Sequence, residues 1–264
     1  MQSILQDYFS SLKGKKVAVI GIGISNTPLI EKLLDAGVSV LACDKRERGS
    51  FDGLIERLEA KGLEVSLGPD YLERLDGADV IFRTPGMRPD LPQLAAAVER
   101  GATLTSEMEA FLALCPCRII AVTGSDGKTT TTTIIAGFLK SAGYRTFVGG
   151  NIGHPLLAQT GTIRPEDIAV LELSSFQLMR MKTSPHIAVT TNLSPNHLDV
   201  HKDYAEYIDA KANIFTHQLP EDLAVFNADN ADSVAQAAAA PGRVRWFSRR
   251  KELDEGVFLR GDAV

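Results

Sequence analysis

The stretch Thr123-Gly124-Ser125-Asp126-Gly127-Lys128-Thr129-Thr130-Thr131 decides the class of this protein. An apolar run at residues 119–122 precedes it, and residues 130–139 have a pattern that is typical of a helix. Strand, glycine turn, Lys-Thr pair and helix form a phosphate-binding loop, because backbone N–H groups and the positive helix end face the anion. We expect Lys128 to add charge and the Thr129 hydroxyl to ligate Mg²⁺.

This loop departs from the standard pattern in one position. Six residues before the lysine, where that pattern has a glycine, the chain has Val122, so the loop is a shorter variant with glycines at 124 and 127. The plain alternative is a solvated glycine-rich turn. Because a strand and a helix flank the loop, we predict that it binds a nucleoside triphosphate.

The composition narrows the classes of function. The 264 residues include 44% hydrophobic and 23% charged residues, which is typical of a soluble globular protein of up to two domains. The net charge of −5, without a basic stripe, argues against nucleic acid as a partner. Residues 1–15 do not resemble a secretory signal, and no apolar run is long enough to span a bilayer, so we expect a cytoplasmic protein without a membrane partner.

Two further features concern organisation and thiols. Cys115 and Cys117 flank a proline without a second metal-ligand pair, which favours structural thiols over a metal site. Strand-like runs alternate with helical patterns along the chain, which predicts βαβ units and parallel sheets. We expect the boundary between the two domains at the Cys115-Pro116-Cys117 segment. The predicted fold is therefore α/β: a Rossmann-like domain over residues 1–116 and a phosphate-loop domain over residues 117–264.

A second glycine turn lies near the N-terminus. Gly21-Ile22-Gly23-Ile24-Ser25-Asn26 follows a strand-like run, and Asp44 ends the next one. This is most of a dinucleotide-binding fingerprint, with asparagine in place of the last glycine. Thr84-Pro85-Gly86 is a candidate second wall of the same site. We predict a diphosphate-bearing nucleotide at this turn, and NAD remains the alternative, which would make the protein a dehydrogenase.

Polar residues gather around the phosphate loop. Glu172 ends an apolar strand, where a carboxylate can hold Mg²⁺ on triphosphate oxygens, although a buried structural glutamate is the alternative. His197, Asp199 and His201 share one predicted loop, and without a third soft ligand nearby we do not expect zinc. From the residues alone, Lys211 is expected to be a solvated lysine.

These motifs together resemble the Mur ligase family, ATP-dependent enzymes that add amino acids to UDP-linked muramic acid precursors of peptidoglycan. The similar segments run in order along the chain: GIGIS (21–25), Asp44-Lys45-Arg46, TPGM (84–87), TGSDGKTTT (123–131), GGNIGHPLL (149–157), ELSSFQL (172–178), TNLSPNHLDVH (191–201), YIDAKANIF (207–215) and VFNADN (225–230). Within the family they are most similar to the branch that adds D-glutamate to UDP-N-acetylmuramoyl-L-alanine.

The resemblance implies a role for each matching residue. ATP would be bound by Gly124, Ser125, Asp126, Gly127, Lys128, Thr129 and Thr130, and Mg²⁺ by Thr129, Glu172, His197 and a carbamylated Lys211. The catalytic set would be Lys128, Glu172, His197 and Lys211. The UDP substrate would be bound by Ile24, Ser25, Asp44, Arg46, Gly86 and Asn151.

The resemblance also implies a reaction and its limits. The alanine carboxylate of the substrate would attack ATP to give an acyl phosphate, which the D-glutamate amine would then displace. Another Mur ligase with a different amino acid remains an alternative, as does a silent substrate-binding fragment. The family's third domain does not follow within the 264 residues, so we expect the chain to be folded but inactive alone, and we expect a monomer.

Overall fold

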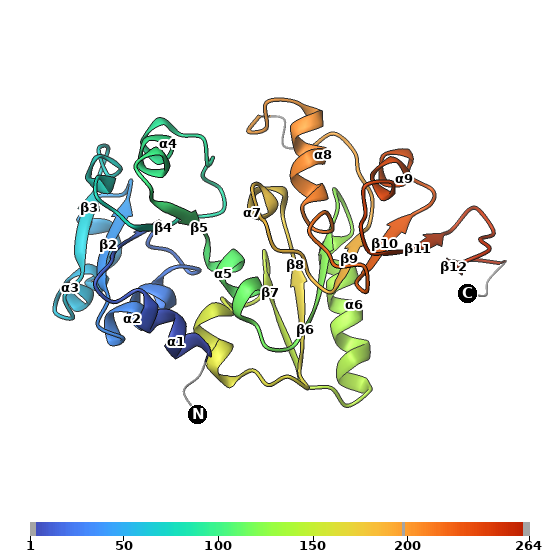
Figure 1. Ribbon diagram of the computed structural model, residues 1–264, viewed down its shortest axis with the longest axis horizontal. Coiled ribbons are helices and arrows are strands. Elements are labelled where there is room, and N and C mark those ends of the chain that lie inside the picture. Colours follow the sequence, from blue (N-terminus) through green and yellow to red (C-terminus); the bar gives the residue numbers. More distant parts are fainter. Residues whose placement is uncertain (1–3, 197–198, 261–264) are drawn as a thin grey trace. The chain divides into compact units, whose positions relative to one another are not determined.

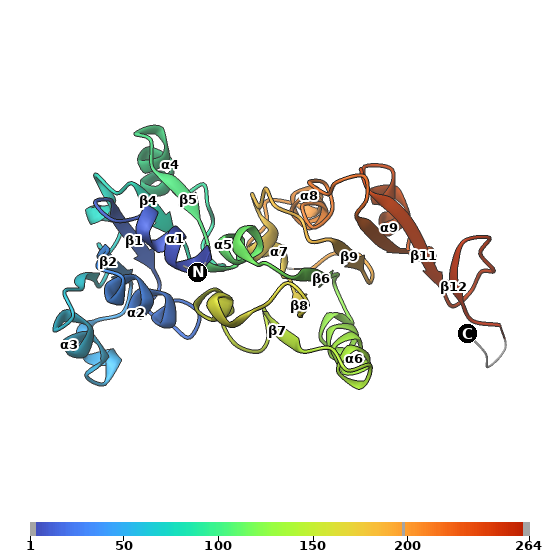
Figure 2. The same ribbon diagram turned by 60° about the horizontal axis from the view of Figure 1, so that its bottom comes forward.

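The computed structural model describes residues 4–196 and 199–260, which divide into two compact units. The first unit comprises residues 1–114 together with Pro155–Thr162, and the second comprises Cys115–His154 and Ile163–Val264. Each contains one wholly parallel sheet (Figures 1 and 2), so the predicted α/β class with two parallel sheets is confirmed. Across the described residues, no helix has the length and apolar character that crossing a membrane requires.

The first unit is built on a five-stranded sheet in the order β3-β2-β1-β4-β5. The buried strand Lys16–Ile20 pairs in register with its two neighbours, and Val19 and Ala42 are fully buried. The apolar face of the second helix, which includes Leu29 and Leu33, is buried as its spacing predicts. Its elements are α1 (Ile4–Ser11), β1 (Lys16–Ile20), α2 (Thr27–Asp35), β2 (Ser39–Asp44), η1 (Arg48–Phe51), α3 (Leu54–Glu59), β3 (Glu64–Leu67), η2 (Glu73–Leu75), β4 (Val80–Phe82), α4 (Pro92–Glu99), β5 (Thr103–Thr105), α5 (Glu107–Leu114) and η3 (Leu157–Thr162).

The segment Pro155–Thr162 belongs to the first unit although it lies far along the chain. Glu107 of α5 is buried, and its Oε1 accepts the N–H of Leu157 at 2.8 Å. Burial raises the pKa of Glu107 to about 7, against the opposing effect of the backbone hydrogen bonds from this segment. The domain boundary expected between residues 116 and 117 lies two residues from the observed division. A single boundary, however, did not predict that residues 155–162 return to the first unit.

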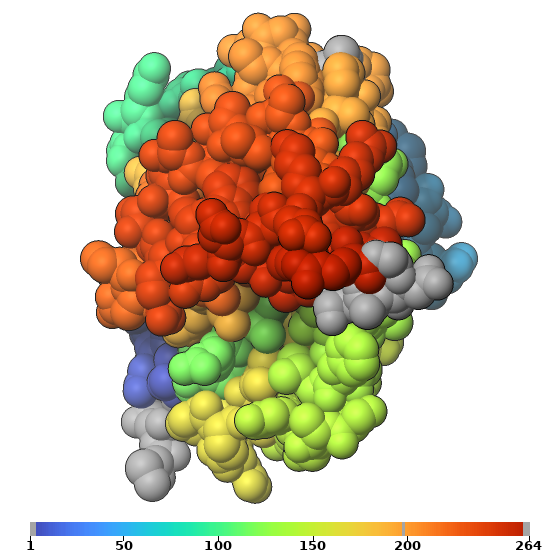
Figure 3. Space-filling model, turned by 90° about the vertical axis from the view of Figure 1, so that its right-hand side faces the viewer, coloured from blue at the N-terminus to red at the C-terminus, as the bar shows by residue number. Residues whose placement is uncertain are grey.

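The second unit is built on a seven-stranded sheet in the order β12-β11-β10-β9-β6-β8-β7. Its inner strand β6, which lies between β9 and β8, is apolar from Ile119 to Val122 and leads into the phosphate loop. Helix α6 packs against β6, β7 and β8, where Ala136 contacts a cluster that includes Ile120 and Val170. The edge strand β12 lies at the surface in the red region of Figure 3, and Val257 in it is 56% exposed. The elements are β6 (Arg118–Thr123), α6 (Lys128–Ser141), β7 (Thr146–Gly150), β8 (Ile168–Glu172), α7 (Ser175–Leu178), β9 (Ile187–Thr190), α8 (Tyr204–Ala212), β10 (Leu223–Asn227), α9 (Ala231–Ala237), β11 (Arg243–Ser248) and β12 (Gly256–Phe258).

Candidate functional site

The phosphate loop connects the end of β6 to the start of α6, as the sequence predicts. Gly124 has φ +148°, and a Cβ there would collide with the Thr191 side chain. Gly127 has φ +76° and directly precedes the helix. Glycine adopts these backbone conformations without the strain that other residues would carry. The two glycines therefore allow β6 to turn directly into α6.

The first half of this loop is fixed by the neighbouring strand end. The Ser125 N–H donates to Asn192 O at 2.9 Å, and the Asp126 N–H donates to Asn192 Oδ1 at 3.0 Å. Ser125 is 5% exposed, and its Oγ lies 2.9 Å from the Tyr207 hydroxyl. Ser125 and Asp126, both predicted to bind ATP, thus form these hydrogen bonds with other groups of the protein. The first turn of α6, which starts at Lys128, has N–H groups without an acceptor inside the helix, and such groups are able to bind an anion.

Lys128 lies at the mouth of the loop. Its Nζ donates to Gly124 O at 2.9 Å and to Ser125 O at 2.8 Å. Both acceptors are carbonyl groups of the loop itself, so no carboxylate contact holds the ammonium in these bonds. A phosphate oxygen is a stronger partner for an ammonium than a carbonyl group, because the hydrogen bond joins two charged groups.

Glu172 is brought to the phosphate loop by strand β8, where it is the last residue. Its side chain is buried, and Oε2 accepts the hydroxyl of Thr129 at 2.7 Å. Oε1 accepts the side-chain amide of Asn151 at 2.8 Å, and the backbone N–H of Asn151 donates to Glu172 O at 2.8 Å. A Cβ at Gly150 would collide with the same carbonyl oxygen, so only glycine permits this close approach. Asn151, predicted as a substrate contact, here orients Glu172.

Lys211 differs from the expectation drawn from the residues alone, because it is 2% exposed instead of solvated. Its Nζ donates to Gly124 O at 2.8 Å, the same carbonyl that Lys128 contacts, and lies 4.8 Å from the centre of the Tyr207 ring. Burial and the charge of Lys128 lower the pKa of Lys211 to about 7, against the opposing charge of Glu172. A substantial share of the amine is therefore uncharged near neutral pH, unlike that of an ordinary lysine.

Two histidines follow strand β9, and the structure describes one of them, His201. His197, predicted to ligate Mg²⁺, lies outside the described residues. His201 is 2% exposed, its Nε2 lies 2.9 Å from Ser175 Oγ, and its Nδ1 lies 3.4 Å from Glu206 Oε2. It stacks on Phe176 with ring centroids 5.3 Å apart. His201 thus packs between α7 and α8 in the core of the second unit.

The donor groups around Glu172 suit Mg²⁺, which prefers hard oxygen ligands and keeps several waters. Glu172 offers carboxylate oxygens and Thr129 offers a hydroxyl, 2.7 Å apart. Within residues 4–196 and 199–260, no group of three or more His, Cys, Asp and Glu side chains is placed to hold a metal ion. Among the described residues, Glu172 and Thr129 are thus the protein groups at this point that could hold Mg²⁺, beside phosphate oxygens and water.

The first unit contains a cavity of about 610 Å³ at the carboxyl ends of its strands, where open parallel sheets bind ligands. The structure brings together at this cavity five of the residues predicted to bind the UDP substrate: Ile24, Ser25, Asp44, Arg46 and Gly86. Asn151, the sixth, belongs to the second unit. Ile24 is 85% exposed, so a large apolar side chain is available to a ligand at the turn.

Asp44 and Arg46 form the charged wall of this cavity. Asp44 accepts the N–H of Ile22 at 2.8 Å and two guanidinium bonds from Arg46, at 3.0 Å to Oδ1 and 2.8 Å to Oδ2. Burial acts to raise the pKa of Asp44, but the hydrogen bonds from Arg46 and Ile22 outweigh it and hold that pKa below its usual value. The side chain of Arg46 remains 44% exposed and also lies 4.3 Å over the Phe51 ring. The wall therefore combines a fixed carboxylate with an accessible cation.

Sequence reasoning missed several residues that shape the two sites. In the cavity these are Tyr71, Arg88 and Leu91, and at the phosphate loop they are Asn192 and Tyr207. Thr84 and Met87, which also line the cavity, belong to the TPGM segment that the sequence had indicated. Arg88 and Leu91 follow closely on the TPGM segment, and Asn192 follows a predicted strand. Because ligands bind at the carboxyl ends of parallel strands, these positions in the sequence could have indicated all three residues. Tyr207 gave no such signal, because an aromatic residue in a helix is ordinary core material.

Comparison with known proteins agrees with this geometry. A family model described as the Mur ligase middle domain matches residues 122–259, and one described as the MurD-like N-terminal domain of Mur ligases matches residues 15–106. A protein of Ruminiclostridium cellulolyticum named UDP-N-acetylmuramoylalanine–D-glutamate ligase is 52% identical over all 264 residues, and one of Acetivibrio thermocellus with the same name is 51% identical. The chain spans 57% of the length of each of these relatives.

Solved structures agree in fold. A UDP-N-acetylmuramate:L-alanyl-gamma-D-glutamyl-meso-diaminopimelate ligase from Neisseria meningitides has a TM-score of 0.57 at 20% identity, covering 92% of this chain and 82% of that one. UDP-N-acetylmuramate-alanine ligase from Thermotoga maritima has a TM-score of 0.51 at 21% identity, covering 90% of this chain and 53% of that one. With a middle-domain match over more than half of its residues, this chain belongs to the Mur ligase family.

Proposed function

We propose that this chain carries the substrate-binding and ATP-binding parts of a ligase that adds D-glutamate to UDP-N-acetylmuramoyl-L-alanine in peptidoglycan synthesis, and thereby serves cell shape and cell division. The relatives at about 50% identity have the name of that enzyme, and the first unit matches a MurD-like model. The observation that carries the catalytic part is the 2.7 Å contact between Thr129 and Glu172 beside Lys128.

In this proposal the phosphate loop binds the triphosphate of ATP. The N–H groups that open α6 face the phosphates, and Lys128 exchanges its loop carbonyl partners for a phosphate oxygen. Thr129 and Glu172 would hold Mg²⁺, together with His197. When bound, Mg²⁺ supplies charge neutralisation of the transferring phosphoryl group. Asn151 keeps the Glu172 carboxylate oriented towards Thr129 throughout.

Lys211 is proposed to be carbamylated. Carbamylation needs an uncharged amine, and the lowered pKa of Lys211 provides one near neutral pH. Addition of the amine nitrogen to CO₂ releases one proton and gives an anionic carbamate. The new oxygens would replace a buried cation beside Lys128 with an anion, which removes the repulsion that lowers the amine pKa.

The reaction that follows is carboxyl activation. The alanine carboxylate of the UDP-linked substrate attacks the γ-phosphate, giving ADP and an acyl phosphate, and the D-glutamate amine displaces phosphate through a tetrahedral intermediate. Lys128 stabilises charge on the transferring group, and the fixed loop positions it. In the first unit, Arg46 would bind the diphosphate of the substrate, while Ile24 and Ser25 contact its uridine end.

We further propose that the protein acts in the cytoplasm as a monomer, with no nucleic-acid or membrane partner. The formal net charge of −5 does not favour binding to nucleic acid, and anionic substrates of this size need only a few cations at their binding sites. Sedimentation equilibrium of the chain with and without ATP tests the monomer directly.

Two measurements test the proposal. Calorimetry should show UDP-N-acetylmuramoyl-L-alanine binding to the 264-residue chain and no comparable binding of NADH, and tight NADH binding would favour a dehydrogenase instead. Phosphate release from ATP should depend on D-glutamate in a full-length relative and be absent from the 264-residue chain. If L-alanine or meso-diaminopimelate supports release better than D-glutamate does, the protein is a sibling ligase and the D-glutamate assignment is wrong.

A further inference from the structure

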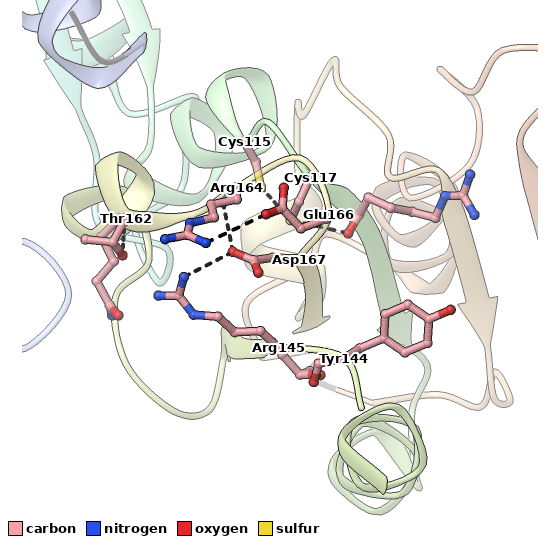
Figure 4. A network of polar contacts seen from close by, with 11 residues as sticks. Cys115, Cys117, Tyr144, Arg145, Thr162, Arg164, Glu166 and Asp167 are labelled. Carbon is pink, nitrogen blue, oxygen red and sulfur yellow. Dashed lines mark hydrogen bonds and ion pairs between the residues drawn. The ribbon is translucent and has the colours of Figure 1, made fainter. Parts of the chain in front are cut away.

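Two thiols lie side by side where the chain passes from α5 into β6. Cys115 is half-buried and Cys117 is 2% exposed, and their sulfur atoms are 3.4 Å apart. Figure 4 draws the pair together with Asp167 and the arginines that contact it. Neither thiol has a part in the proposed reaction, and the phosphate loop lies at the opposite end of β6.

The local backbone explains why the two sulfurs meet. Pro116 fixes its own φ and restricts Cys115 to an extended conformation. Side chains two residues apart in extended chain point to the same side, and the chain bends at Cys117. A disulfide needs about 2 Å between the sulfurs. From 3.4 Å, a shift of roughly 1.4 Å closes the bond.

The two thiols are chemically unequal. The hydrogen bond between the two thiols lowers the pKa of Cys115, against the opposing effects of burial and of the Asp167 charge. The same bond, together with burial, raises the pKa of Cys117. Asp167 is 3% exposed and its charge is partly offset by Arg145 at 3.5 Å. Cys115 is therefore both the more accessible thiol and the better source of thiolate.

We propose that Cys115 and Cys117 form a thiol–disulfide exchange site for a small-molecule disulfide of the glutathione type. The Cys115 thiolate attacks one sulfur of the oxidant, which forms a mixed disulfide and releases one thiol. Cys117 then loses its proton to solvent and attacks the Cys115 sulfur, which releases the second thiol. Two protein thiols are oxidised to one disulfide, and one small-molecule disulfide is reduced to two thiols.

The product is expected to be readily reversible. The ring closed by residues 115–117 is very short, so the bond removes little entropy from the unfolded chain and stores strain in the folded one. Strained and accessible disulfides are the labile ones. A stable structural cross-link is therefore not expected at this position.

The test uses the 264-residue chain, oxidised glutathione and mass spectrometry. We expect the protein to lose the mass of two hydrogen atoms, with a cross-link between Cys115 and Cys117 in the peptide map, and to regain that mass in excess dithiothreitol. Cys43 is the internal control, because it is fully buried and burial raises its pKa to about 12. Absence of the cross-link, or a cross-link between two molecules only, overturns the proposal.

Two variants test the assigned order. Cys117→Ser should accumulate one glutathione on Cys115, and Cys115→Ser should take up no more glutathione than Cys43 does. Equal labelling of both variants contradicts the assignment of Cys115 as the attacking thiol. Because either variant could fold poorly, timed alkylation of the wild-type protein gives an independent readout: Cys115 should react at least tenfold faster than Cys43. ATP binding should not change on oxidation.

Discussion

Both units place an acidic residue beside a glycine turn, but the groups that contact the carboxylate differ. In the first unit Asp44 is paired with the guanidinium of Arg46 at 2.8 Å. In the second unit Glu172 is held by the neutral groups of Thr129 and Asn151, at 2.7 and 2.8 Å. A carboxylate bound by a cation has its charge compensated, whereas one bound by a hydroxyl and an amide keeps its full charge.

From this difference we propose different chemistry for the two turns. The compensated Asp44 positions Arg46 so that an accessible cation lines the cavity, as a negatively charged ligand without its own metal requires. Glu172, whose direct hydrogen-bond partners are neutral, would suit a ligand that arrives with Mg²⁺. A glycine turn at a strand end thus indicates phosphate, and the partner of the nearby acid indicates whether a metal accompanies it.

The largest effect is expected from the glycines. Gly124→Ala should lower the free energy of unfolding of the second unit by about 3 kcal/mol or more, because φ +148° is strained for alanine and its Cβ meets Thr191. The matched change Gly23→Ala meets nothing within 4 Å and should cost less than about 1 kcal/mol. Urea denaturation of both variants measures the difference. Equal losses would contradict the close packing described for the phosphate loop.

Lys128→Ala should weaken ATP binding by roughly 30-fold, about 2 kcal/mol, because it removes a charged hydrogen-bond donor to phosphate. Binding of UDP-N-acetylmuramoyl-L-alanine should not change. Titration calorimetry with each ligand gives both numbers. Lys140→Ala, an exposed lysine at the other end of the same helix, is the control and should bind ATP as the wild type does. A similar loss in the control would point to general electrostatics instead of a phosphate contact.

The buried Lys211 predicts an unusual pH dependence. Its pKa is lowered to about 7 in the folded protein and returns to about 10.5 on unfolding. Between these values the unfolded chain binds the extra proton, so stability rises with pH, by at most about 1.4 kcal/mol per pH unit. Urea midpoints at pH 7 and pH 9, without CO₂, should therefore increase more in the wild type than in Lys211→Met. The same increase in both proteins would rule out Lys211 as its source.

The smallest effect is expected in the first unit. Arg46→Ala should weaken binding of the UDP-linked substrate by roughly fivefold, about 1 kcal/mol, because Arg46 is partly exposed and water screens its charge. Arg48→Ala, which removes surface ion pairs with Glu56 and Glu59, is the matched control. Competition against a fluorescent UDP analogue resolves such a difference. If the affinity of Arg46→Ala is unchanged, the diphosphate does not bind at Arg46 and must contact another wall of the cavity.

The strands and turns that position both sites could be predicted because their signals are local. Apolar runs such as residues 119–122 and glycines before a helix report directly on backbone geometry. Strand β7 gives only a weak sequence signal because Gly149 and Gly150 interrupt its apolar pattern, and its extended form depends on pairing with β8. The η3 segment gave no signal of its return to the first unit, since that depends on the buried Glu107.

The environment of a side chain was less predictable than its position. Lys211 occupies an ordinary helix, and only the packing of Tyr207 and the loop around it removes it from water. The contact of Asn151 with Glu172 also depends on the register of β7 against β8, which brings Gly150 opposite Glu172. The burial of Lys211 and the Asn151–Glu172 contact arise from tertiary packing, and the spacing of residues in the sequence does not indicate them.

Hydrogen–deuterium exchange with each ligand tests the central assignment most directly, because one experiment reports on both units. UDP-N-acetylmuramoyl-L-alanine should protect residues 21–26, 44–46 and 84–88, and Mg²⁺-ATP should protect residues 124–131 and 149–151. The account predicts two separate patterns. Protection of residues 124–131 by the UDP-linked substrate alone, or of residues 21–26 by Mg²⁺-ATP alone, would contradict it.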